Sequence, residues 1–151
     1  MECLETAIKK PKTWIPTKDD AISNQLIEAY QTGLKDGVEQ QQKLVFSKLK
    51  ENIDKSGSLT LSLIDTIKKY GFTPLDAYLR VESFDRFEIM ITVPETDALK
   101  DEFLEMYDVI SKIEIENRND LYDVFISFCS TNDHFDENIV SSDGYSLKMC
   151  I

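Results

Sequence analysis

Acid–base or metal chemistry in this sequence has to use His134, because it is the only histidine in the chain. It lies in a short acidic segment, Asp133-His134-Phe135-Asp136-Glu137. Carboxylate oxygens and an imidazole nitrogen can bind divalent cations, so this segment is the candidate metal loop. All of these groups come from one loop, and no second set of ligands with matching spacing accompanies them. We therefore expect a solvated acidic loop and assign no metal ligand.

A cysteine nucleophile is the second chemical possibility, because Cys129 precedes His134 by five residues. Cys129 ends an apolar run typical of a buried strand, and burial disfavours the reactive thiolate. Cys3 and Cys150 add no C-x-x-C pair, so we expect reduced thiols in a reducing compartment. The sequence also contains no phosphate-binding loop and no zinc-protease or serine-hydrolase signature. We assign no catalytic residue and no cofactor.

The charge of the chain is strongly negative and unevenly distributed. Lys and Arg number 17 and Asp and Glu number 28, which gives a net charge of −11. Residues 76–151 carry 6 basic and 18 acidic side chains, a net charge of −12. Such a field repels phosphate backbones, so we expect no nucleic-acid partner. The acidic half is either an ordinary solvated surface or a docking face for a basic protein or peptide.

Length and hydropathy indicate one globular domain. The chain has 151 residues, of which 42% are hydrophobic and 30% charged, as in ordinary globular proteins. Its apolar runs are much shorter than a membrane span, and its N-terminus lacks the pattern of a signal peptide. We therefore expect a cytoplasmic location and no membrane partner.

The N-terminal third is predicted to be an arm attached to this domain. Residues 1–18 form a lead-in segment, because Pro11 and Pro16 prevent a long helix. Trp14 between them either pins the segment to the body or belongs to a loose tail. Residues 19–55 carry apolar side chains at helical spacing and are predicted to form a long helix or a helical hairpin. Ser56-Gly57-Ser58 is the expected boundary between arm and body.

Two glycines mark a candidate interface within the arm. Gly33 and Gly37 share one helix face, where the absence of a Cβ allows another backbone to approach. Tyr30, Leu34 and Val38 flank them with apolar surface. These five residues are the predicted helix interface, either within the chain or across a dimer. The alternative is a kink at the glycines.

Residues 56–151 are predicted to form an acidic α+β body. Apolar spacing predicts a helix at 61–70 and a strand hairpin at 77–81 and 87–93. It also predicts a helix after Pro94 with Leu99 in its buried stripe, a central strand at 121–129, a loop at 130–143 and a last strand at 144–151. The predicted fold class is thus α+β. A long N-terminal helix or helical hairpin precedes an α-β-β-α-β-β body, with the helices on one face of a four-stranded, mostly antiparallel sheet.

These features favour a non-enzymatic protein that acts through protein–protein contact. We expect a homodimer built on the arm, with a basic protein or peptide as a further partner. The alternative is a small-ligand binder or enzyme whose pocket lies between helix and sheet and is lined by Tyr78, Tyr107 and Tyr122.

Overall fold

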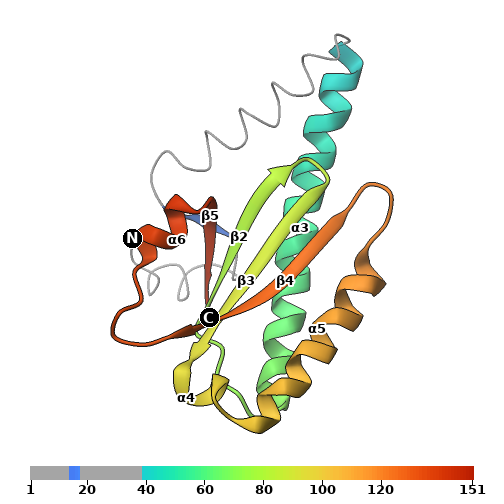
Figure 1. The fold of residues 1–151 in the computed structure, drawn as a ribbon. Helices are drawn as coiled ribbons and strands as arrows, with labels where there is room; N and C mark the ends of the chain where they lie inside the picture. Colours follow the sequence, from blue (N-terminus) through green and yellow to red (C-terminus); the bar gives the residue numbers. More distant parts are fainter. Residues whose placement is uncertain (1–13, 18–38) are drawn as a thin grey trace.

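The computed structural model of the protein describes residues 14–17 and 39–151 (Figure 1). The fold is α+β, with a long helix near the N-terminus and a five-stranded mixed sheet. The elements are β1 (Ile15–Pro16), α3 (Glu39–Lys69), β2 (Asp76–Ser83), β3 (Arg86–Pro94), α4 (Glu95–Ala98), the 3-10 helix η1 (Asp101–Phe103), α5 (Leu104–Asn117), β4 (Asp123–Thr131), α6 (Glu137–Ser142) and β5 (Tyr145–Cys150).

The sheet has the strand order β1-β5-β2-β3-β4. β3 and β4 are parallel, whereas the other neighbouring strands are antiparallel. The prediction of four strands was wrong, because β1 adds a short edge strand next to β5. β4 also lies at an edge rather than in the centre. Val124 and Ile126 are buried on the face that packs against α5, whereas Phe125 on the other face is 42% exposed beneath the Arg118 guanidinium, so the expectation of two apolar faces was wrong.

One continuous helix replaces the predicted break at Ser56-Gly57-Ser58, because α3 runs through these residues. Hydrogen bonds satisfy the polar side chains of this part of α3. The hydroxyls of Ser56 and Tyr122 share a hydrogen bond of 2.8 Å, and Thr60 Oγ1 donates to the Ser56 carbonyl at 2.7 Å. Because Ser56 and Thr60 are buried and satisfied, they support the helix instead of ending it.

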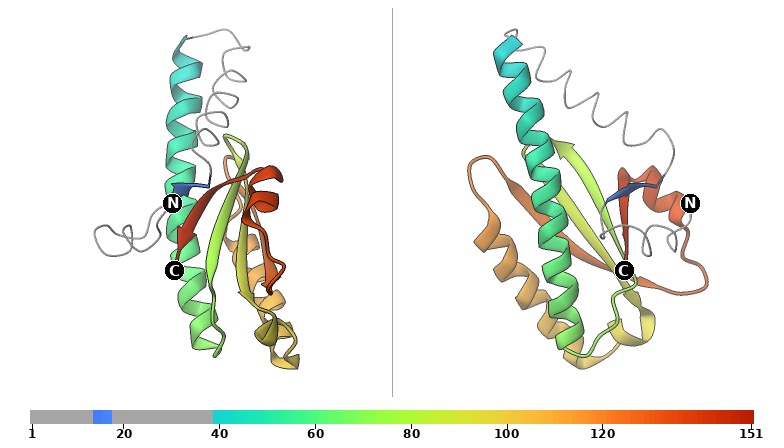
Figure 2. Two further views of the ribbon diagram at one scale, coloured as in Figure 1. Left: turned by 90° about the vertical axis from the view of Figure 1, so that its left-hand side faces the viewer. Right: turned by 180° about the vertical axis from the view of Figure 1, so that it is seen from behind.

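The main core lies between the sheet and the helices α3 and α5. Leu63 and Ile67 of α3 and Met106 and Ile110 of α5 belong to one cluster with a face of the strands. The strand residues of this cluster alternate along each strand, as the hairpin prediction required: Ala77, Leu79, Val81, Phe87, Ile89, Ile91, Val93, Val124, Ile126, Leu147 and Met149. α6 lies on the opposite side of the sheet from α3 (Figure 2).

Trp14 connects the N-terminal segment to the body. Its side chain is half-buried and packs against the core cluster, and β1 pairs with β5 beside it. Gly57 makes this contact possible, since a Cβ at this position would lie 3.2 Å from Trp14 Nε1. The predicted helix interface of Tyr30, Gly33, Leu34, Gly37 and Val38 lies outside the described residues.

Two elements between β3 and β5 differ from the prediction. The expected helix after Pro94 is divided into α4, η1 and α5, because Lys100 adopts an extended conformation. The expected loop at 130–143 contains α6, whose start is capped by Asp136 accepting a hydrogen bond from the Asn138 amide at 2.9 Å. Within the described residues, no helix has the length and apolar character of a membrane span.

Candidate functional site

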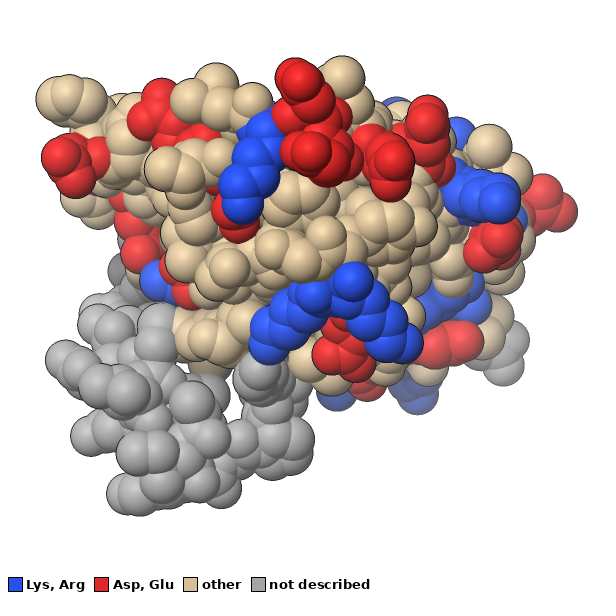
Figure 3. Space-filling model, turned by 90° about the horizontal axis from the view of Figure 1, so that it is seen from below, with Lys and Arg blue, Asp and Glu red and all other residues tan. Residues whose placement is uncertain are grey.

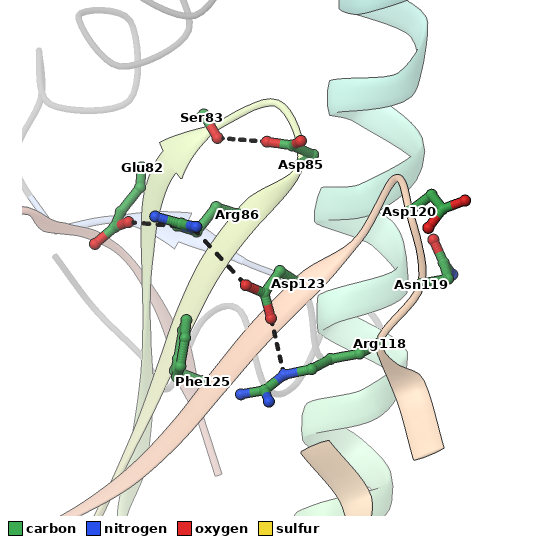
Figure 4. Close-up of a pocket in the computed structure, with 9 residues that line it drawn as sticks. All are labelled: Glu82, Ser83, Asp85, Arg86, Arg118, Asn119, Asp120, Asp123 and Phe125. Atoms are coloured by element: carbon green, nitrogen blue, oxygen red, sulfur yellow. Dashed lines mark hydrogen bonds and ion pairs between the residues drawn. The ribbon is translucent and has the colours of Figure 1, made fainter. Parts of the chain in front are cut away.

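A cavity of about 560 Å³ opens where the β2–β3 turn meets the connection from α5 to β4 (Figure 4). Charged and polar side chains dominate its walls, and Phe125 is the one aromatic residue among them. The lining residues are Glu82, Ser83, Asp85, Arg86, Arg118, Asn119, Asp120, Asp123 and Phe125.

Both arginines of this cavity are paired with carboxylates. Arg118 Nε lies 2.8 Å from Asp123 Oδ1, at an angle that forms no hydrogen bond, and its guanidinium lies over the Phe125 ring. Arg86 Nε lies 3.8 Å from Asp123 Oδ2 and 3.9 Å from Glu82 Oε2. The cavity wall therefore carries four carboxylates and two arginines, and both arginines are already paired, so its net charge is negative. This arrangement ties β3, β4 and the end of α5 together and does not favour an anionic ligand.

A second cavity, of about 270 Å³, lies beside α6. We call it the α6 pocket, and its walls are mostly apolar. It brings together Cys129, His134 and Asp136 from the segments that the sequence marked as chemically interesting. The complete lining is Met90, Cys129, His134, Phe135, Asp136, Ile139, Val140, Asp143 and Tyr145.

The structure brings only some of the predicted chemical groups together. Burial raises the pKa of the Cys129 thiol, which opposes formation of the thiolate. Asp133 does not line the α6 pocket, and Glu137 Oε2 is held 3.0 Å from Lys148 Nζ. Among the residues that the structure describes, no group of His, Cys, Asp and Glu side chains is arranged to hold a metal ion. The sequence-based expectation of reduced thiols is wrong for Cys150, which is disulfide-bonded, whereas Cys129 is a free thiol.

The three tyrosines expected in one pocket lie in three different places. Tyr122 is buried in the core and stacks on Phe87 at 5.6 Å. Tyr78 is buried on the face of the sheet that carries α6, where its ring lies 6.4 Å from Phe135. Tyr107 is exposed on α5. The predicted pocket between helix and sheet is therefore not formed by these side chains.

An apolar surface lies at the end of the molecule where α3 ends and α5 begins. Leu99 and Leu104, five positions apart in the chain, are 76% and 68% exposed, which is unusual for large apolar residues in neighbouring elements. Figure 3 shows this end, with uncharged side chains across its middle, acidic side chains along one edge and basic side chains on the opposite side. The exposed apolar residues of this end are Tyr70, Leu75, Leu99, Leu104 and Tyr107, and we call them the end surface.

A cluster of aromatic rings lies between the end surface and the core. The Phe103 ring contacts Phe72 at 5.0 Å, Phe128 at 4.9 Å and Tyr107 at 5.9 Å. A hydrogen bond of 2.8 Å from the Thr73 amide to Asp97 Oδ2 fixes the turn after α3 against α4. The elements that carry the end surface are therefore held together by packing and hydrogen bonding.

Acidic side chains predominate on α4, η1 and α5, whereas the last turn of α3 carries the exposed Lys68 and Lys69. Between residues 95 and 108 there are six acidic residues and one basic residue, Lys100, whose Nζ lies 3.2 Å from Asp97 Oδ1. The other acidic residues are exposed, and none forms an ion pair with a described residue: Glu95, Asp101, Glu102, Glu105 and Asp108.

Sequence reasoning missed the end surface because it placed Leu99 in a buried stripe. That stripe assumed one unbroken helix, but the extended Lys100 between α4 and η1 turns Leu99 outward. For Leu104, the helical spacing of the sequence did indicate exposure. In a helix that buries Met106 and Ile110, residue 104 falls on the opposite side.

Comparison with protein-family models, with curated proteins and with solved structures found no match to this chain.

Proposed function

We propose that the protein binds a basic protein segment through the end surface, and that this contact rather than catalysis is its function. The observation that carries the proposal is the exposed pair Leu99 and Leu104 on a supported part of the fold. Apolar side chains at the centre of a surface with a polar rim are typical of protein interfaces.

The exposed acidic residues near the end surface indicate the charge of the partner. Five exposed carboxylates without a partner among the described residues lie on α4, η1 and α5, so a positive segment gains attraction there and an acidic one is repelled. Acidic residues at the start of a helix also stabilise the helix itself, which accounts for some of this charge. Helix stability does not account for the exposed leucines. We therefore infer a partner segment that combines apolar side chains with Lys or Arg.

The test uses a fluorescein-labelled synthetic helical peptide with leucine on one face and lysine on the other. The double substitution Leu99→Ser and Leu104→Ser is expected to weaken binding about tenfold or more in fluorescence anisotropy, because each buried leucine contributes about 1–2 kcal/mol. The matched control is Ile115→Ser with Leu121→Ser, which removes two other exposed apolar side chains and is expected to leave the affinity unchanged.

Charge is tested separately on the same peptide. Asp101→Asn with Glu105→Gln is expected to weaken binding and its dependence on salt, whereas a peptide with glutamate in place of lysine is expected not to bind. Equal losses in the end-surface and control variants would show that the peptide binds without using this surface. That outcome, or absence of binding to the unmodified protein, contradicts the proposal.

We also propose a homodimer through the arm of residues 19–55. The described part of this arm supports it, because α3 extends beyond the sheet (Figure 1) and carries Leu44, which is 70% exposed, before Leu49, the first buried residue among those of α3 whose side chains are described. Light scattering is expected to give the mass of a dimer at both low and high salt concentration. A monomer in both would overturn this proposal without affecting the end surface.

The cytoplasmic location stays a prediction from the sequence. The free thiol of Cys129 is compatible with a reducing compartment, whereas the disulfide at Cys150 is more typical of an oxidising one. Fractionation of cells that express the full chain is the deciding measurement.

A further inference from the structure

β4 is an edge strand, and its outer side pairs with no strand that the structure describes. Its inner side pairs with β3 along its whole length. Backbone N–H and C=O groups of successive residues in a strand point to opposite sides, so every second residue of β4 directs them away from β3. The Asp123 amide lies on the β3 side, because it donates to the Asp85 carbonyl at 2.7 Å. Four residues therefore direct their backbone groups outward, and we call them the β4 edge: Val124, Ile126, Phe128 and Ser130.

One side chain occupies part of the β4 edge. The Ile126 amide donates a hydrogen bond of 2.8 Å to Glu114 Oε2 of α5. The amides of Phe128 and Ser130 form no hydrogen bond with a described residue. Edge strands usually carry charged residues or proline, which prevent further pairing. Residues 124–132 are instead uncharged, the longest such run within residues 76–151. The second half of the edge is therefore open to another strand.

The exposed side of α5 extends beyond the β4 edge. Figures 1 and 2 show α5 next to β4, on the side away from β3. The helix runs antiparallel to the strand, because Glu114 reaches Ile126 whereas the earlier Tyr107 contacts the later Phe128, with ring centroids 5.6 Å apart. Ile115 follows Tyr107 by two helical turns and is 71% exposed. A strand added to β4 would place every second side chain against this side of α5.

The surroundings of the β4 edge indicate the composition of such a strand. The exposed Ile115 and the rings of Tyr107 and Phe128 favour apolar side chains at alternate positions. Asp108 follows Tyr107 on α5, Asp133 follows the end of β4, and both are exposed. Residues 76–151 together have a net charge of −12. Lys or Arg at the polar positions of the strand is therefore attracted, and acidic residues are repelled.

We propose that the β4 edge binds an extended segment of a partner protein as a sixth strand of the sheet. The outward backbone groups of Phe128 and Ser130 pair with the backbone of the segment, and its alternate apolar side chains cover Ile115. Backbone pairing supplies affinity in this mode of recognition, and the alternate side chains supply selectivity. Leu99 and Leu104, which test the end surface, are not part of this site, so either proposal can fail without the other.

The probe is a fluorescein-labelled peptide with blocked ends, Lys-Val-Thr-Val-Thr-Val-Lys, titrated into the full chain. Saturable binding is expected in fluorescence anisotropy. Hydrogen exchange observed by NMR locates it, because an amide without a hydrogen bond exchanges rapidly. The amides of Phe128 and Ser130 are expected to exchange rapidly in the free protein and slowly in the complex. The amides of Ser127 and Cys129, which face β3, are expected to be protected in both states.

Ser130→Pro removes one outward amide and leaves the hydrogen bonds between β3 and β4 in place. This variant is expected to weaken peptide binding about tenfold. Ser130→Ala is the matched control, since it changes the same side chain and retains the amide, and its affinity is expected to be unchanged. Melting temperatures of the two variants report whether the fold is retained.

N-methylation of the peptide tests the backbone pairing without any change in the protein. N-methyl groups on the three valines block one side of the extended peptide, and N-methyl groups on the two threonines block the other. One of these peptides is expected not to bind, whereas the other retains its affinity. A peptide with glutamate in place of lysine is expected to bind more weakly.

Absence of saturable binding, equal affinities of Ser130→Pro and Ser130→Ala, or equal effects of the two methylated peptides overturns the proposal. Light scattering identifies a competing occupant. A smaller mass for Ser130→Pro than for the unmodified protein would show that a second copy of the chain occupies the β4 edge, and this outcome also overturns the proposal.

Discussion

Replacing Asn52 with alanine is expected to lower the free energy of unfolding by about 2–4 kcal/mol, as measured by urea denaturation. Asn52 is 1% exposed, and its side-chain amide donates to the Phe84 carbonyl at 2.8 Å and to the Leu121 carbonyl at 2.9 Å. One side chain of α3 thereby holds both the β2–β3 turn and the segment before β4. The substitution leaves both carbonyls without this donor.

Glu51→Ala is the matched control for Asn52→Ala, since it changes the neighbouring residue of the same helix. Glu51 is exposed and pairs with Lys48 on the surface, so a change of at most about 0.5 kcal/mol is expected. Similar losses for the two variants would show that the hydrogen bonds of Asn52 add nothing beyond helix formation.

Replacing Gly57 with leucine is expected to displace Trp14 from α3. The Cβ at this position would lie 3.2 Å from Trp14 Nε1 and 3.5 Å from Cδ1, and the longer side chain needs the space that the indole fills. Because Trp14 is the only tryptophan, its fluorescence emission reports the event directly. A shift to longer wavelength is expected as the indole enters water. The short pairing of β1 with β5 is expected to weaken with it.

Two other variants separate this contact from the effect of helix propensity. Gly57→Ala would ordinarily stabilise a helix interior by about 1 kcal/mol, but the close approach to the indole is expected to cancel most of that gain. Ser58→Leu places the same large side chain at the next, exposed position and is expected to leave the emission unchanged. An unshifted spectrum for Gly57→Leu would mean that Trp14 does not depend on the glycine.

The sequence predicted those elements whose pattern is local. The hairpin of β2 and β3 followed from alternation, because Leu79 and Ile89 face the core whereas Arg80 and Glu88 pair on the opposite face. The pairing of β4 could not be predicted in this way, because the parallel partner of Ile126 is Ile89, far away in sequence. Parallel or antiparallel pairing depends on the crossover through α5, and a strand's own residues do not specify it.

The candidate sites were less predictable than the fold. The α6 pocket combines Met90 from β3 with Cys129 and Phe135, and no spacing in the sequence connects them. The sequence did single out the segment around His134, but as a solvated acidic loop that was weighed only as a candidate for metal binding. The end surface depends on the extended conformation of Lys100, which the apolar spacing around Leu99 did not indicate.

By itself, then, the sequence determined the α+β class, the acidic C-terminal half and the faces of the hairpin strands, because these follow from composition and from the period of neighbouring residues. Only the tertiary structure decided that Ser56, Gly57 and Thr60 lie inside one helix, since partners distant in sequence, Tyr122 and Trp14 among them, contact these small residues. It also decided that Leu99 faces solvent and that the Tyr78 hydroxyl is buried without a partner among the described residues. Burial of a side chain depends on which elements pack around it, and that packing is not encoded in local spacing.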